Sequence, residues 1–110
     1  MRQIVINELS DEDLVQAKAF LKENARPGGI NGMYWLDLPE ELLDEAQQGH
    51  EQCGPFMFGL ELGDDFLSLE LLVRSQSNLH CSCTAYATKS QRNFALEYLD
   101  NLVQVTNIKA

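Results

Sequence analysis

The stretch "FMFGLELGDDFLSLELLVR" (residues 56–74) decides the fold that the sequence predicts. Apolar residues alternate in it with polar or small ones, which is typical of β-strands with one buried face. The "GDD" at 63–65 is a tight-turn signal, and it predicts one strand at 56–62 and another at 66–74. The residues expected on the inward face are Phe56, Phe58, Leu60, Leu62, Leu67, Leu69, Leu71 and Val73.

Two further strands are expected around this hairpin. The polar segment "SQSN" (75–78) turns the chain again and leads into a third strand at 79–87, so the three strands form an antiparallel meander. The N-terminal stretch "QIVINEL" (3–9) contains β-branched residues and suits a fourth strand. The sequence leaves open whether this first strand joins the sheet at an edge or lies beside a strand of the meander.

Three helices are expected from capping signals and apolar spacing. Helix 11–24 follows "SDED" and helix 89–106 follows "TKSQ", and both tetrapeptides resemble capping boxes. A short helix at 38–48 is predicted by Asp37 as the N-cap and Gly49 as the stop signal. The order is β-α-α-β-β-β-α, an α+β fold with a three- to four-stranded antiparallel sheet packed on one face by helices.

Length and charge narrow the class of protein. A chain of 110 residues is expected to form a single domain, residues 1–110. Seventeen acidic and eight basic residues give a formal charge of -9, which argues against nucleic acid and anionic membranes as partners. The N-terminus resembles neither a signal peptide nor a transit peptide, and no run is long and apolar enough to span a membrane. We therefore expect a cytoplasmic protein with reduced thiols.

The segment "LHCSCTAYAT" (79–88) contains two of the three cysteines. If it is a strand, Cys81 and Cys83 share one apolar face with Leu79, while His80 points to the other face. Free cysteine behaves as a small hydrophobic residue in such a position. The favoured interpretation is therefore that both thiols pack in the core.

A metal site is the alternative interpretation of the cysteines. The segment "HEQC" supplies His50 and Cys53, and with Cys81 and Cys83 these form a Cys3His set, which tetrahedral zinc accepts. The sequence does not establish whether Cys53 lies near the other two cysteines. No metal, cofactor or catalytic residue is therefore assigned.

The glycine-rich stretch "ARPGGINGMYWLD" (25–37) is expected to be a connection after the first helix. It lacks the Gly-Lys-Ser/Thr of a phosphate-binding loop and does not lead from a strand into a helix. Its tail "MYWL" (33–36) holds four large apolar residues, including the only Trp. These either plug the end of the core, which we favour, or form an exposed contact patch.

The predicted function rests on exposed surfaces, because no catalytic pattern is present. The candidate interaction residues are Met33, Tyr34, Trp35, Leu72, His80 and Tyr86. The sequence favours a non-enzymatic protein-interaction module that forms a homodimer or binds another protein. The alternative is a small-molecule or zinc-binding domain that uses the loop 26–56 and the outer sheet face.

Overall fold

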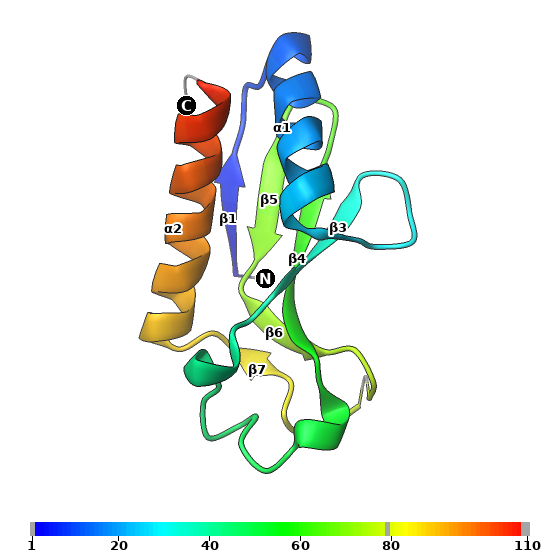
Figure 1. The fold of residues 1–110 in the computed structure, drawn as a ribbon, viewed down its shortest axis with the longest axis vertical. Helices are drawn as coiled ribbons and strands as arrows, with labels where there is room; N and C mark the ends of the chain where they lie inside the picture. The colour runs from blue at the N-terminus through cyan, green and yellow to red at the C-terminus, as the bar shows by residue number, and fades with distance from the viewer. Residues whose placement is uncertain (1, 79, 109–110) are drawn as a thin grey trace.

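The computed structural model describes residues 2–78 and 80–108, which form an α+β fold with one open antiparallel sheet of seven strands and two α-helices (Figure 1). The strands are β1 (Gln3–Ile6), β2 (Arg26–Pro27), β3 (Met33–Asp37), β4 (Phe56–Leu62), β5 (Leu67–Glu70), β6 (Leu72–Ser75) and β7 (Ala85–Tyr86). The helices are α1 (Asp11–Asn24) and α2 (Lys89–Thr106), with short 3-10 turns η1 (Glu40–Leu42) and η2 (Glu51–Cys53). The predicted α+β class and antiparallel sheet are confirmed.

Strand β4 is the centre of the sheet. The main strand order is β1-β5-β4-β3-β2, and β6 pairs with the other end of β4 and with β7. Leu60 of β4 faces Leu69 of β5, whereas Met57 faces Arg74 of β6. The first strand joins the sheet at its edge, where β1 pairs antiparallel with β5, which settles the position that the sequence left open.

Both helices begin where the capping signals predict. Ser10 accepts a hydrogen bond from the backbone N–H of Asp13, and the Asp13 side chain accepts one from Ser10, so the capping box is complete. Thr88 and Gln91 make the equivalent pair at the start of α2. Helix α2 ends at Thr106, and the capping residue Asn107 adopts the left-handed conformation with φ 62°.

The core lies between the helices and one face of the sheet. In Figure 1 α1 crosses in front of β4 and β5, and α2 runs alongside α1. Leu21 of α1 and Leu102 of α2 are buried, as are the strand residues Phe58, Leu60 and Leu69. Six of the eight residues predicted to face inward are buried, and Leu62 and Leu71 are partly buried. Burial does not alternate strictly, because Met57 and Ser68 on the opposite face are buried as well. Within the described residues, no helix is long and apolar enough to cross a lipid bilayer.

The sheet has more strands than the predicted three or four, partly because the expected strand 66–74 is interrupted at Leu71. Before Leu71 the chain pairs with β1, and after it the chain pairs with β7 and the far end of β4. The backbone N–H of Leu71 still donates to the carbonyl of Arg2 on the β1 side, whereas its own carbonyl accepts from the N–H of Ala87 on the β7 side. The change of partner bends the chain, and a continuous apolar alternation carries no signal of that change.

The "MYWL" segment, predicted to lie outside regular structure, is strand β3. Gly29 and Gly32 have φ of 86° and 88°, and these conformations allow a turn that pairs β2 with β3. Trp35 therefore faces the outer side of the sheet opposite Gly59, whereas Leu36 is buried. The segment is neither a core plug nor a wholly exposed patch, because its side chains alternate between the two faces.

The predicted helix 38–48 is wrong, since only the three residues of η1 are helical in that range. Asp37, expected as its N-cap, belongs to β3, and its carboxylate pairs with Arg26 at 2.6 Å. Pro39 before η1 and Leu43 after it both have extended backbone conformations. The carboxylate that should have capped the helix is therefore committed to the outer sheet face.

The predicted strand 79–87 is reduced to the two residues of β7. Residues 80–84 form turns, and residue 79, which the prediction placed on the inward face, lies outside the described residues. The backbone N–H of Thr84 donates to the carbonyl of Cys81, which closes a tight turn. Strand alternation therefore does not apply to Cys81 and Cys83.

The division of α1 into a buried and an exposed side predicts the effects of two substitutions by alanine on stability. Leu21 is fully buried and Val15 is 66% exposed on the same helix. We expect Leu21→Ala to lower the free energy of unfolding by about 2–5 kcal/mol, because it leaves a cavity. The matched Val15→Ala should change it by less than about 0.5 kcal/mol. Urea denaturation followed by circular dichroism measures both, and equal losses would contradict the assigned helix orientation.

Candidate metal centre

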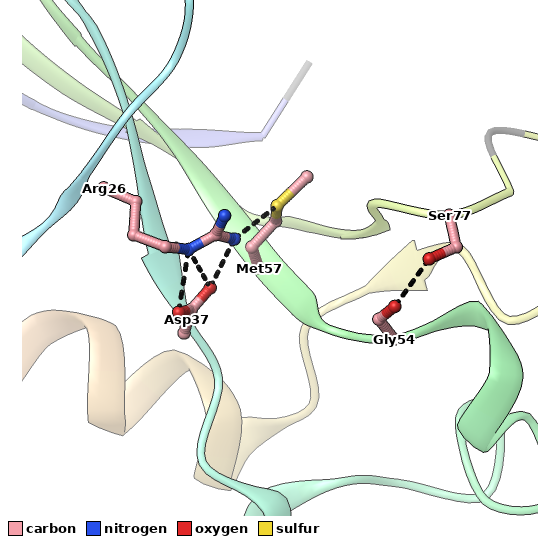
Figure 2. A network of polar contacts seen from close by, with 5 residues as sticks. All are labelled: Arg26, Asp37, Gly54, Met57 and Ser77. Carbon is pink, nitrogen blue, oxygen red and sulfur yellow. Dashed lines mark hydrogen bonds and ion pairs between the residues drawn. The ribbon is translucent and has the colours of Figure 1, made fainter.

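Two irregular segments meet at the end of the sheet remote from the α1–α2 contact. One runs over residues 38–54 between β3 and β4, and the other over 76–84, leaving out residue 79, between β6 and β7 (Figure 1). The Ser77 hydroxyl donates to the carbonyl of Gly54 at 2.7 Å, as Figure 2 shows. The Ser75 hydroxyl donates to the carbonyl of Cys53. These bonds hold the two segments together.

The side chains of His50, Cys53, Cys81 and Cys83 converge at this junction. Their ligand atoms all lie within 4.8 Å of one another. The Sγ atoms of Cys53 and Cys81 are 3.4 Å apart, and Cys81 Sγ lies 3.2 Å from His50 Nδ1. Ligand atoms around a tetrahedral zinc ion are separated by roughly 3.5–3.8 Å, given its usual bond lengths. The cluster therefore has nearly the size that one zinc ion requires.

Local backbone turns aim each pair of ligands at the same point. The backbone N–H of Cys53 donates to the carbonyl of His50 at 2.8 Å, so the short turn η2 brings both side chains to one side. The backbone N–H of Cys83 donates to Cys81 Sγ at 3.3 Å. Two cysteines separated by one residue thus converge through a turn, without the shared strand face that the sequence predicted.

The three thiols of the cluster differ in environment. Cys83 is fully buried, whereas Cys53 and Cys81 are half-buried. Hydrogen bonds from the thiol and then the backbone N–H of Cys83 lower the pKa of Cys81 to about 7. Burial raises the pKa of Cys83 to about 12, and the hydrogen bond with Cys81 raises the pKa of Cys53. The cluster therefore concentrates thiolate character on Cys81, its central sulfur.

A buried pair of glutamines connects the cluster to the start of α2. Gln47 Nε2 donates to the carbonyl of Cys83 at 3.0 Å, and Gln91 Nε2 donates to Gln47 Oε1 at 3.1 Å. Both side chains are 1% exposed. The backbone at Cys83 is therefore held by the side chain of Gln47. Gln47 is held in turn by Gln91 in the first turn of α2.

The sequence did not identify this support. Gln47 lies in a stretch predicted to be helical. The sequence identifies Gln91 only as the partner of Thr88 in a capping box. Both glutamines are polar side chains without a charge, and such residues are usually exposed. Burial of Gln47 becomes visible only when the distant residues Cys83 and Gln91 are brought to it.

The predicted interaction residues do not form a single surface. Met33 and Trp35 lie on the outer face of β3, whereas Tyr34 packs against the core. Leu72 pairs with Tyr86 across β6 and β7, and the guanidinium of Arg2 lies 4.6 Å from the centre of the Tyr86 ring. His80 is exposed beside the cysteine turn and does not belong to the metal-ligand cluster.

The glutamine network predicts different effects for two neighbouring residues. Gln47→Ala leaves buried partners without hydrogen bonds, so we expect the free energy of unfolding to fall by about 1–3 kcal/mol. Gln48 is exposed and serves as the matched control, with an expected change below about 0.5 kcal/mol for Gln48→Ala. Denaturant titration of both variants checks this, and a Gln47→Ala protein as stable as the parent would disprove the support role.

Comparisons with known proteins give no guidance on this site. Neither protein-family models, nor curated proteins, nor solved structures match the chain. The function of the chain is therefore argued from the residues, distances and burial of the cluster and of the surfaces around it.

Proposed function

We propose that the protein is a zinc-binding domain in which His50, Cys53, Cys81 and Cys83 hold one Zn²⁺ ion. One observation carries this proposal: four side chains of the types that zinc prefers, from two separate segments, place their ligand atoms within 4.8 Å of one another. All three cysteines of the chain and one of its two histidines take part. The zinc-binding alternative of the sequence analysis is thus the function that the geometry supports best.

The chemistry of the donor set supports zinc and a structural role. Three sulfurs and one imidazole nitrogen favour a borderline-soft ion in tetrahedral geometry. Four protein ligands fill that geometry, so no position is left for a water or a substrate. The proposed ion is therefore a cross-link, in agreement with the expectation of a non-enzymatic protein.

The need for such a cross-link follows from the poor packing of the two ligand-bearing segments. Within residues 38–54 the fully or nearly buried side chains are Leu38 and Gln47, and within 76–84, leaving out residue 79, Cys83 is the buried one. Apolar burial therefore contributes little to holding these segments in place. A bound ion would supply the missing free energy, because its binding energy acts on the folded state alone.

The self-associating interaction module predicted from the sequence remains a separate prediction. Two copies would each carry a formal charge of -9, and this charge opposes association at low ionic strength. Light scattering after size exclusion, at low and high salt, measures the subunit number directly.

The zinc proposal predicts a stoichiometric metal with a defined ligand set. We expect one zinc per chain by elemental analysis, and a tetrahedral thiolate spectrum when cobalt replaces zinc. His50→Ala should weaken zinc binding by more than about 100-fold, since it removes a direct ligand. His80→Ala is the matched control, because His80 is the other histidine and lies outside the cluster.

The same proposal predicts which cysteines become protected by the metal. Zinc should block alkylation of Cys53 and Cys81, the half-buried thiols, and a chelator should restore it. Saturating zinc, at about 1,000 times its Kd, should raise the free energy of unfolding by about 4 kcal/mol. The proposal is wrong if the protein purified with zinc holds no stoichiometric metal and its two half-buried thiols are alkylated equally with and without zinc.

Zinc affinity should fall steeply as the solution becomes acidic. Both Cys53 and Cys83 have raised pKa values, that of Cys83 about 12, so both thiols hold their protons in the metal-free protein near neutral pH. Zinc must displace both protons, so we expect its Kd to increase about 100-fold for each pH unit lost above about pH 7. The dependence should become steeper at lower pH, because Cys81, whose pKa is about 7, then also holds its proton. Competition with a chromophoric chelator measures this slope. A Kd independent of pH would show that thiolates are not the ligands.

A further inference from the structure

The face of the sheet opposite the helices carries side chains that the core does not use. Strand alternation and register place Trp35, Met57, Glu61 and Arg74 on this outer face. The Arg26 guanidinium pairs with Asp37 and also contacts Met57 Sδ at 3.3 Å, as Figure 2 shows. No helix among the described residues covers this side, and its centre lies beside Trp35.

A hollow of about 220 Å³ opens on this face next to Trp35. Its floor is Gly59, which has no side chain, and a Cβ there would lie 3.3 Å from Cζ3 of the Trp35 ring. The indole therefore leans over the glycine and forms a wall of the hollow. The remaining lining residues are Gln3, Met33, Leu60, Glu61, Ser68, Glu70 and Arg74.

The charges around the hollow favour a cation as its occupant. Arg74 donates to Glu70 at 2.7 Å, so these two groups neutralise each other. Glu61 is exposed and makes no ion pair with another described residue, so its carboxylate is the remaining charge of the lining. An aromatic face beside a carboxylate attracts organic cations. The formal charge of -9 of the whole chain adds a long-range attraction of the same sign.

A serine hydroxyl adds a hydrogen-bonding group at the same place. Ser68 is 8% exposed and lines the hollow beside Glu61, its partner across β4 and β5. A serine hydroxyl that lines the hollow can accept a hydrogen bond from a group that enters it.

We propose that the outer sheet face is a docking surface for a basic segment of another protein, which inserts an arginine side chain into the hollow beside Trp35. The planar guanidinium stacks on the indole and donates hydrogen bonds to the carboxylate of Glu61 and the hydroxyl of Ser68. Arginine fits better than lysine, because a guanidinium both stacks on aromatic rings and binds a carboxylate with two parallel hydrogen bonds. This surface shares no residue with the proposed metal centre.

Two other occupants fit the observations less well. An anion would need a free cation, but Arg26 and Arg74 beside the hollow are both committed to carboxylates. A second copy of the chain would bring together two molecules that each carry a formal charge of -9. A basic partner removes this repulsion, and it is the occupant that the test below addresses first.

The only Trp of the chain lies at the proposed surface, so its fluorescence is a direct probe. The zinc-treated protein is titrated with a terminally blocked Gly-Arg-Gly-Arg-Gly peptide, and with the same peptide carrying glutamine in place of arginine. We expect a saturable change of Trp35 emission with the arginine peptide alone. Glu61→Gln should weaken this binding by about fivefold, the effect of losing one partly exposed ion pair.

The matched control is Glu97→Gln, which removes an exposed carboxylate from α2, on the opposite side of the sheet. It should leave the affinity unchanged, and circular dichroism should show that both variants are folded. Equal weakening by the two substitutions would mean attraction by overall charge alone and would overturn the proposal. Binding of the glutamine peptide, or protection of Trp35 by a concentration-dependent dimer, would overturn it as well.

Discussion

The alternation of side chains along β4 is the constraint on which the rest of the structure depends. This strand pairs with β3 along most of its length, with β5 at its end and with β6 at its start, so it joins both ends of the sheet. Phe58 and Leu60 are fully buried beneath the helices, whereas Gly59 between them opens the outer face. A shift of one residue in its register would exchange these faces and remove both the core and the hollow.

The two ends of the molecule are held by different kinds of interaction. At one end, α1 and α2 bury apolar side chains against the sheet, and the edge-to-face contact of Phe20 with Tyr98 joins the helices. At the other end, irregular chain is held by polar bonds and by the convergence of three thiols and an imidazole. This division explains why a metal cross-link would benefit one end specifically, since the hydrophobic effect already stabilises the other.

The proposed metal centre and the proposed docking surface are separate features of one scaffold. The chain between β3 and β4 carries His50 and Cys53, and the two strands that flank it present Trp35 and Gly59 on the outer face. A cross-link at the base of this connection would limit movement of β3 against β4. The metal centre would therefore support the surface through the backbone, without a residue that belongs to both.

The sequence by itself determined the two capped helices, the central hairpin and the inward face of that hairpin. These features depend on neighbours within a few residues, and periodicity and capping report such neighbours directly. Only the tertiary structure decided that Asp37 pairs with Arg26 instead of capping a helix, and that the chain around Cys81 turns. The convergence of Cys53 with Cys81 and the burial of Gln47 likewise required contacts between residues far apart in the chain. Local pattern carries no information about such contacts, because they are set by how the strands pair and where the connections between them meet.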